Sequence, residues 1–206
     1  MSPDGRGSVL RRAIGAERLK NMQIIKTSLP GAIIIEPDVF GDARGFFLET
    51  WNRQRYAEIG LDIDFVQDNL SYSQQGTLRG LHFQNPRAQG KLVYVLIGEV
   101  YDVSVDVRHG SPTFGQWIGV TLSAENKRQL YVPPGFAHGF CVTSENALFA
   151  YKCTECYDPK SEGSVLWNDP ELGITWPVSE PRLSEKDRHA LRLRDIPPGR
   201  LEFRAV

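Results

Sequence analysis

Short runs of apolar residues, many alternating with polar ones, follow one another along most of this chain. Such runs are typical of β-strands when turn residues separate them. The strands predicted in this way are Ile33–Glu36, Phe46–Trp51, Phe65–Ser73, Leu78–Gln84, Lys91–Ile97, Val100–Val107, Trp117–Leu122, Phe140–Thr143 and Ala147–Cys153. Turn signals such as Gly98-Glu99 and Pro133-Pro134-Gly135 lie between them. Many short strands at regular spacing predict an all-β sandwich or barrel.

Two short helices are expected among the strands. Asn52 is a suitable N-cap for a helix that runs to about Ile59, with Gly60 ending it. Ser184 begins a second helix near the C-terminus, and the spacing from Ser184 to Asp187 resembles a capping box with Asp in place of Glu or Gln. On spacing alone, Asp187 is therefore interpreted as a capping residue.

The alternation within two strands bears on where a binding site could lie. In Phe65–Ser73, four polar side chains share one face: Gln67, Asn69, Ser71 and Ser73. This polar ladder faces either solvent, the more common arrangement, or a wet barrel interior that binds a polar ligand. In Val100–Val107, valines alternate with Asp102, Ser104 and Asp106. We expect that strand to be half-buried and to have a structural role only.

Length and charge limit the possible classes of protein. The 206 residues, 41% hydrophobic and 24% charged, suit one soluble domain of moderate size. With 24 Lys and Arg against 25 Asp and Glu, the net charge is −1, which argues against a nucleic-acid coat or a membrane-surface protein. The longest strongly apolar run, Leu92–Ile97, is too short to cross a bilayer. An anion site in this chain must therefore be local.

The N-terminus and the cysteines suggest a cytoplasmic protein. The first 21 residues contain no apolar stretch of signal-peptide length. We expect residues 1–21 to be a poorly ordered extension and residues 22–206 to form a single domain. Three cysteines without a secretory signal favour reduced thiols in the cytoplasm. Cys153 and Cys156 form one C-x-x-C pair, but a structural zinc site needs four ligands.

His82 lies between two cations in the chain, Arg79 and Lys91. Arginine binds phosphate through a fixed fork of donors, histidine accepts a proton near neutral pH, and lysine stabilises a developing oxyanion. The three residues together suit an anionic substrate that must lose a proton. A lone histidine in a β protein is more often a packing or surface residue, and both interpretations stay open on spacing alone.

The sequence lacks the motifs of several cofactor-dependent classes of enzyme. It has no H-x-H or H-x-x-x-H pair for a metal, no Walker loop, no G-x-G-x-x-G after a strand and no G-x-S-x-G elbow. The chemistry that remains uses His, Lys, Tyr and Asp with neither metal nor cofactor. Two alternatives are a metal-dependent cupin oxygenase, disfavoured by the missing H-x-H, and a non-catalytic sugar-binding or structural jelly roll.

Several longer runs resemble the dTDP-4-dehydrorhamnose 3,5-epimerase family, and they occur in the family's order between about Met22 and Asp187. They are Val39–Glu49, Phe65–Asn69, Leu78–Gln84, Gln89–Val93, Ser111–Trp117, Leu122–Leu130, Gly135–Phe140, Tyr151-Lys152 and Trp167–Pro170. The resemblance implies an all-β, cupin-type jelly roll with a few short helices, and a homodimer. It implies epimerisation at C3 and C5 of a dTDP-4-keto-6-deoxyhexose in dTDP-L-rhamnose biosynthesis. Both carbons lie beside the C4 ketone, so that removal of either proton gives an enolate and no cofactor is needed.

The resemblance also implies roles for individual residues. His82 matches the base that removes the α-proton, and Asp187 matches the carboxylate paired with it. Lys91 matches the lysine that stabilises the enolate oxygen, and Tyr151 the tyrosine that protonates the other face. The positions that match substrate-binding residues are Arg44, Glu49, Gln67, Asn69, Arg79, His138, Glu162 and Lys186. Arg44 and Glu49 are expected to contact the nucleotide bound to the neighbouring subunit.

Plainer interpretations of these residues remain. Tyr151 has the alternation of a core aromatic, and His138 follows a turn that it could simply hydrogen-bond. Arg79 and His82 should point to opposite faces of a regular strand unless Gly80 supplies a bulge.

The chain also departs from the family in two places. The loop between His82 and Lys91 is one residue shorter than in familiar members, and Cys156 stands where an aromatic residue is common. Relatives that invert only C3 or only C5, for antibiotic sugars, are the alternative within this family.

Overall fold

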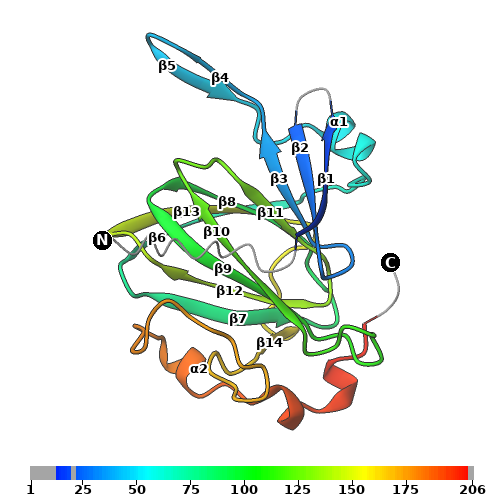
Figure 1. The fold of residues 1–206 in the computed structure, drawn as a ribbon. Coiled ribbons are helices and arrows are strands. Elements are labelled where there is room, and N and C mark those ends of the chain that lie inside the picture. Colours follow the sequence, from blue (N-terminus) through cyan, green and yellow to red (C-terminus); the bar gives the residue numbers. More distant parts are fainter. Residues whose placement is uncertain (1–12, 20–21, 204–206) are drawn as a thin grey trace, which may run out of the picture.

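The computed structural model describes residues 13–19 and 22–203, and its main body is two β-sheets packed face to face (Figure 1). The seven-stranded sheet has the order β1-β2-β3-β11-β8-β13-β6, with all neighbours antiparallel. Its strands are β1 (Ala13–Leu19), β2 (Met22–Thr27), β3 (Ile33–Pro37), β11 (Gln129–Val132), β8 (Lys91–Ile97), β13 (Asn146–Cys153) and β6 (Gln67–Gln74).

The second sheet has five strands in the order β10-β9-β12-β7-β14, again antiparallel throughout. They are β10 (Trp117–Ser123), β9 (Glu99–Asp106), β12 (Phe136–Val142), β7 (Leu78–Gln84) and β14 (Glu162–Ser164). Strands close in sequence, such as β8 and β9, lie in different sheets, which gives the jelly roll that the resemblance implied. A separate hairpin of β4 (Val39–Asp42) and β5 (Gly45–Leu48) projects from the body at the top of Figure 1.

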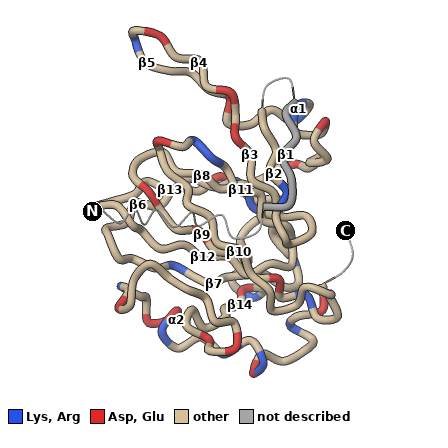
Figure 2. The backbone as a smooth tube through the Cα atoms, in the orientation of Figure 1, with Lys and Arg blue, Asp and Glu red and all other residues tan. Residues whose placement is uncertain are grey.

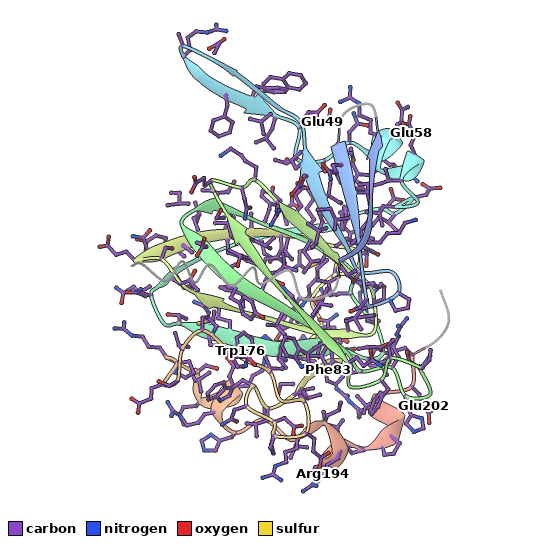
Figure 3. All side chains as sticks on the ribbon, in the orientation of Figure 1. Glu49, Glu58, Phe83, Trp176, Arg194 and Glu202 are labelled. Atoms are coloured by element: carbon purple, nitrogen blue, oxygen red, sulfur yellow. The ribbon has the colours of Figure 1, made fainter. Side chains whose placement is uncertain are left out.

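Apolar side chains fill two layers. Between the sheets lies a core that includes Val93, Leu130, Phe140 and Phe149. A second layer lies between the outer face of the five-stranded sheet and the C-terminal segment, where Figure 3 labels Phe83 and Trp176. Because apolar layers cover both faces of this sheet, β9 is buried almost throughout. The prediction of a half-buried strand at Val100–Val107 was therefore wrong.

The helices are few and short, as predicted. They are α1 (Arg53–Glu58), α2 (Glu185–Arg188) and the 3₁₀ turns η1 (Leu193–Asp195) and η2 (Pro198–Arg200). Asn52 caps α1 by accepting a hydrogen bond from the Arg55 N–H at 3.3 Å, and Gly60, with φ +86°, follows the end of the helix. Ser184 Oγ accepts from the Asp187 N–H at 3.1 Å, which confirms the predicted cap of α2.

The predicted elements differ from the structure in strand boundaries and in several strands that the pattern missed. Ala13–Leu19, expected to be part of a poorly ordered extension, pairs with β2 along its length, so that the sheet begins before residue 22. Residues 1–12 lie outside the described residues. The pattern also missed β2, β4, β11 and β14, and it placed the start of β12 at Phe140, four residues beyond its true start at Phe136.

Candidate active site

A cavity of about 500 Å³ lies between the two sheets, bounded on one side by the residues that lead into α2. A second hollow of about 230 Å³ shares walls with it. His82, Lys91 and Tyr151 line both hollows and therefore lie where the two meet. Together the hollows fall within the ~300–1,000 Å³ typical of small-ligand sites.

Almost all the predicted site residues meet here. The larger hollow is lined by Arg79, His82, Lys91, His138, Tyr151, Lys186 and Asp187, and the smaller one adds Gln67, Asn69 and Glu162. Arg182, which was not predicted, also lines the larger hollow and contributes a further cation. Acidic and basic residues are interspersed along the described chain (Figure 2), so that this concentration of positive charge is local.

A bulge in β7 brings Arg79 and His82 into the same cavity. His82 pairs with His138 of β12, and Arg79 pairs with Phe140, so that three steps along β7 match two along β12. The extra residue returns the two side chains to one face. Gly80 has φ +126°, and a Cβ there would lie 2.5 Å from the Cα of Gly139. Only glycine fits, which confirms the bulge expected from the sequence.

His82 and Asp187 form a hydrogen-bonded pair, with 2.5 Å between His82 Nε2 and Asp187 Oδ1. The carboxylate is nearly buried, whereas the imidazole is 30% exposed. Burial acts to raise the pKa of Asp187, but hydrogen bonds from His82, Ser184 and the Gly80 N–H outweigh it and hold this pKa below its usual value. In the cap of α2 Asp187 thus takes part through its backbone N–H, while its carboxylate is hydrogen-bonded to His82 Nε2, which leaves Nδ1 as the other ring nitrogen of His82.

Lys91 and Tyr151 approach the cavity from the opposite sheet. Lys91 is on β8 and Tyr151 on the adjacent β13, whereas His82 is on β7 of the five-stranded sheet. Burial lowers the pKa of Lys91, although the charges of Cys153, Asp102 and Glu162 oppose this. Burial raises the pKa of Tyr151, so that its hydroxyl keeps its proton to higher pH. A ligand in the cavity would therefore have a potential base on one side and a potential acid on the other.

A second histidine–carboxylate pair adjoins the first. His138 lies opposite His82 in the strand register, and its Nε2 is 2.9 and 3.0 Å from the two carboxylate oxygens of Asp102. His138 also stacks on Phe149, with ring centroids 6.2 Å apart. Asp102 is fully buried, and the sequence analysis had assigned it to structure only. Its alternation with valines gave no signal that separates a solvent-facing carboxylate from one that faces an interior.

The polar ladder of β6 faces the interior, the less common of the two arrangements considered. Leu70 and Tyr72, on the other face, are 65% and 62% exposed. On the ladder, Ser73 Oγ accepts a hydrogen bond from Arg79 Nε at 3.0 Å, and Gln67 donates to Asn69 at 3.0 Å. The ladder therefore forms part of the cavity wall, where Ser73 holds the side chain of Arg79.

Glu162, which lines the smaller hollow, forms an ion pair with Lys186, which lines the larger one. Tyr157, beside the exposed Cys156, donates its hydroxyl to Glu162 at 3.2 Å, and its backbone N–H donates to Gln67 at 2.8 Å. The ring of Tyr157 is 53% exposed at the rim of the hollow. Tyr157 is thus an aromatic surface that the sequence analysis had not assigned to the site.

Arg44 and Glu49 are not brought to this cavity by their own chain. Arg44, near the tip of the β4–β5 hairpin, is paired with Asp42 at 2.6 Å and is 90% exposed. Glu49, labelled in Figure 3 at the base of the hairpin, is paired with Arg55 at 2.9 Å. Either these two residues belong to a site on another subunit or they are not site residues.

Two further findings concern other classes of protein. Among the described residues, no group of three or more His, Cys, Asp or Glu side chains is arranged to hold a metal ion. Within the same residues, no helix has the length and apolarity needed to span a membrane.

Comparison with known proteins identifies the family. The family described as dTDP-4-dehydrorhamnose 3,5-epimerase matches residues 26–195. The dTDP-4-dehydrorhamnose 3,5-epimerase of Salmonella typhimurium is 60% identical over 172 residues, which cover 82% of this chain and 94% of that protein.

Solved structures of similar proteins lead to the same family. A Legionella pneumophila epimerase, crystallised with dTDP-4-keto-L-rhamnose, has a TM-score of 0.87 and 54% identity, covering 90% of this chain and all of that one (100%). A 4-keto-6-deoxy sugar epimerase from the novobiocin gene cluster of Streptomyces spheroides has a TM-score of 0.81 and 41% identity, covering 86% and 90%. From the matched length and the identity, this chain belongs to the dTDP-4-dehydrorhamnose 3,5-epimerase family.

Proposed function

We propose that this protein is an isomerase that inverts C3 and C5 of dTDP-4-dehydro-6-deoxy-D-glucose, giving dTDP-4-dehydro-L-rhamnose for dTDP-L-rhamnose biosynthesis. The observation that carries the proposal is the placement of His82 and Tyr151 on facing sheets around one cavity. Inversion requires a base and an acid on opposite faces of the sugar ring. A non-catalytic sugar-binding module needs no such arrangement.

The chemistry follows from the positions of four side chains. His82 accepts the α-proton, and Asp187 stabilises the imidazolium that forms. The electron pair moves to the C4 oxygen, and the Lys91 ammonium stabilises this enolate oxygen. Tyr151 then delivers a proton to the same carbon from the other face. Each inversion thus moves one proton from carbon to His82 and one from Tyr151 to carbon, and no redox step occurs.

The remaining cavity residues suit a sugar nucleotide. We assign the diphosphate to Arg79, whose side chain has, within the described chain, the neutral Ser73 hydroxyl as its only hydrogen-bond partner. Its fork of donors matches phosphate oxygens. Gln67, Asn69, His138, Glu162 and Lys186 supply the polar contacts for the rest of the ligand. The Legionella relative was crystallised with a ligand of this class.

We further propose that the working form is a homodimer. Three aromatic rings of the β4–β5 hairpin, Phe40, Phe46 and Phe47, are 59%, 60% and 68% exposed, an unusual amount of apolar surface for a monomer. We propose that this hairpin packs against the partner subunit and that Arg44 and Glu49 belong to the partner's site. Sedimentation analysis should give a dimer at micromolar concentration. A fully active monomer would contradict the proposal.

A cytoplasmic location agrees with the cysteines. Cys141, Cys153 and Cys156 are all free thiols, which persist in a reducing compartment. Secretion into an oxidising medium would leave the exposed Cys156 open to disulfide exchange.

Incubation with the 4-keto sugar nucleotide in D₂O tests the proposed reaction directly. Deuterium at both C3 and C5, with inverted product, is the expected NMR result. Deuterium at one carbon only would identify a single-centre epimerase, as the 3-epimerase of Streptomyces niveus is named. Tight dTDP binding without any exchange would indicate a binding module and refute the catalytic proposal.

A further inference from the structure

The β4–β5 hairpin touches the body of its own chain through an aromatic ring. Within the described chain its two strands pair only with each other, and the hairpin projects from the two packed sheets (Figure 1). The Lys127 ammonium lies over the ring of Phe46 on β5, 4.1 Å from the ring centroid. Phe46 is still 60% exposed, so that this cation–π contact holds the ring without burying it. A hairpin that joins neither large sheet depends on such contacts for its direction.

Lys127 has an unusual backbone conformation. Its φ is +57°, a left-handed value that glycine adopts freely and that residues with a side chain seldom adopt. The Lys127 ammonium also donates to the carbonyl oxygen of Ala124, and its backbone N–H donates to the Ser123 carbonyl oxygen at 3.0 Å. Backbone strain of this kind is retained mainly where a residue has a function. The lysine side chain at this position therefore needs an explanation other than stability.

Asn126 and Arg128 hold the loop around Lys127 in place. The side-chain oxygen of Asn126 accepts hydrogen bonds from the N–H groups of Ser123 and Arg128 at 3.1 and 2.9 Å. The Arg128 guanidinium donates to the Glu36 carboxylate at 2.7 Å. Glu36 lies on β3, the strand that precedes β4 in the chain. The loop is thus fixed both to the end of β10 and to the strand from which the hairpin starts.

We propose that Lys127 is a positioning residue, which sets the direction in which the hairpin presents Arg44 and Glu49 to the partner subunit's site. The inference rests on the proposed function, because it requires the homodimer and a sugar nucleotide in the partner's cavity. Lys127 lines neither hollow of its own subunit and acts only through the Phe46 ring.

The expected effect is on affinity rather than on proton transfer. A hairpin that samples several directions is ready to bind the nucleotide for only part of the time, and the apparent affinity falls by that fraction. His82, Lys91 and Tyr151 lie on strands of the two large sheets, so that their placement does not depend on the hairpin. Loss of the Lys127 contact should therefore raise KM and leave kcat unchanged.

The test replaces Lys127 by glycine, which removes the cation and adopts the left-handed conformation without strain. KM for the 4-keto sugar nucleotide should rise by about 2- to 10-fold, the range that an exposed or partly desolvated cation–π contact supplies. The melting temperature, kcat and sedimentation of Lys127→Gly should stay close to those of the wild type. Lys127→Arg keeps a cation and should restore the wild-type KM. The matched control is Glu125→Gln, which alters an exposed charge in the same loop and should leave KM unchanged.

A double-mutant cycle shows whether the effect passes through the aromatic ring. Phe46→Leu keeps an apolar side chain but removes the π face, and it should raise KM about as much as Lys127→Gly does. The variant with both changes should have the same KM as either single variant, because each change removes the same contact.

Three results would overturn the inference. They are a folded Lys127→Gly protein with the wild-type KM, additive effects of the two changes in the double variant, and loss of the dimer in Lys127→Gly, which would assign the contact to assembly. Absence of turnover in the wild type would instead refute the proposed function. Titration calorimetry with dTDP would still test the role of Lys127 in that case, since Lys127→Gly should weaken dTDP binding by about 2- to 10-fold and unchanged affinity would refute it.

Discussion

Replacing Asp187 by asparagine isolates the contribution of charge to the His82–Asp187 pair. Asparagine has nearly the same size, and its backbone N–H can still donate to Ser184 Oγ, as in the wild type at 3.1 Å. The cap of α2 should therefore survive. The change removes the negative charge that lies 2.5 Å from His82 Nε2.

The expected loss follows from the nature of this hydrogen bond. The carboxylate is 4% exposed, so that water screens the interaction little. Hydrogen bonds to charged groups contribute about 1.5–3 kcal/mol, and this interaction is fully formed only when His82 carries the substrate proton. At 1.36 kcal/mol per factor of ten, kcat should fall by about 10- to 150-fold.

Deuterium exchange from D₂O into the sugar, followed by NMR, measures the step that should slow. Asp169→Asn is a suitable control, because this buried carboxylate accepts backbone N–H groups of Glu171 and Leu193 at 3.0 and 2.8 Å, away from the cavity. The Asp169→Asn protein should incorporate deuterium into the sugar at the wild-type rate per folded molecule. A folded Asp187→Asn protein with wild-type exchange would show that the pair does not support the base.

Three further results are expected. Tyr151→Phe should retain much of the solvent exchange while inverted product falls far more, and an equal fall of both would exclude Tyr151 as a distinct acid. Arg79→Ala should weaken dTDP binding more than tenfold, since a charge-assisted contact is worth about 1.5–3 kcal/mol, and Arg79→Lys should restore only part of the affinity. Titration calorimetry measures the affinity, and an unchanged value in Arg79→Ala would remove Arg79 from the site. Burial acts to raise the pKa of Asp106, but hydrogen bonds from Arg108, Ser111 and Thr113 lower it on balance, so its stabilising effect is complete above about pH 4 and is lost as pH falls through the lowered value. The melting temperatures of wild type and Asp106→Asn should therefore differ at neutral pH and converge in strong acid.

The sequence was most informative about strands with alternating apolar residues and about the bulge at Gly80. Alternating apolar residues predicted most strands of both sheets, and Gly80 correctly indicated the bulge that Arg79 and His82 require. The capping interpretation of Asp187 holds for its backbone N–H, which donates to Ser184 Oγ, whereas its carboxylate pairs with His82. The resemblance to a family, rather than the spacing, identified the second role.

Predictions from the sequence failed where the residue pattern of a strand fits more than one environment. A ladder of polar residues looks the same whether it faces water or a polar interior, which is why β6 was ambiguous and Asp102 was missed. The environment is set by long-range partners, namely the C-terminal segment over one face of β9 and the opposite sheet over the other. The predicted boundary at residue 22 failed for a similar reason, because β1 depends on pairing with β2.

The close approach of Gly80 and Gly139 has a consequence for attempts to redesign this enzyme. A Cβ on Gly139 would lie 2.6 Å from the Arg79 carbonyl oxygen, and one on Gly80 would lie 2.5 Å from the Gly139 Cα. The main chain therefore fixes the positions of Arg79 and His82 relative to each other. Side chains on β6 or β13 can be exchanged while the spacing between the Arg79 guanidinium and the His82 imidazole stays fixed. A library that varies the side chains lining the cavity but preserves these two glycines should keep the pairing register of β7 and β12. A library that varies either glycine should yield mostly inactive proteins.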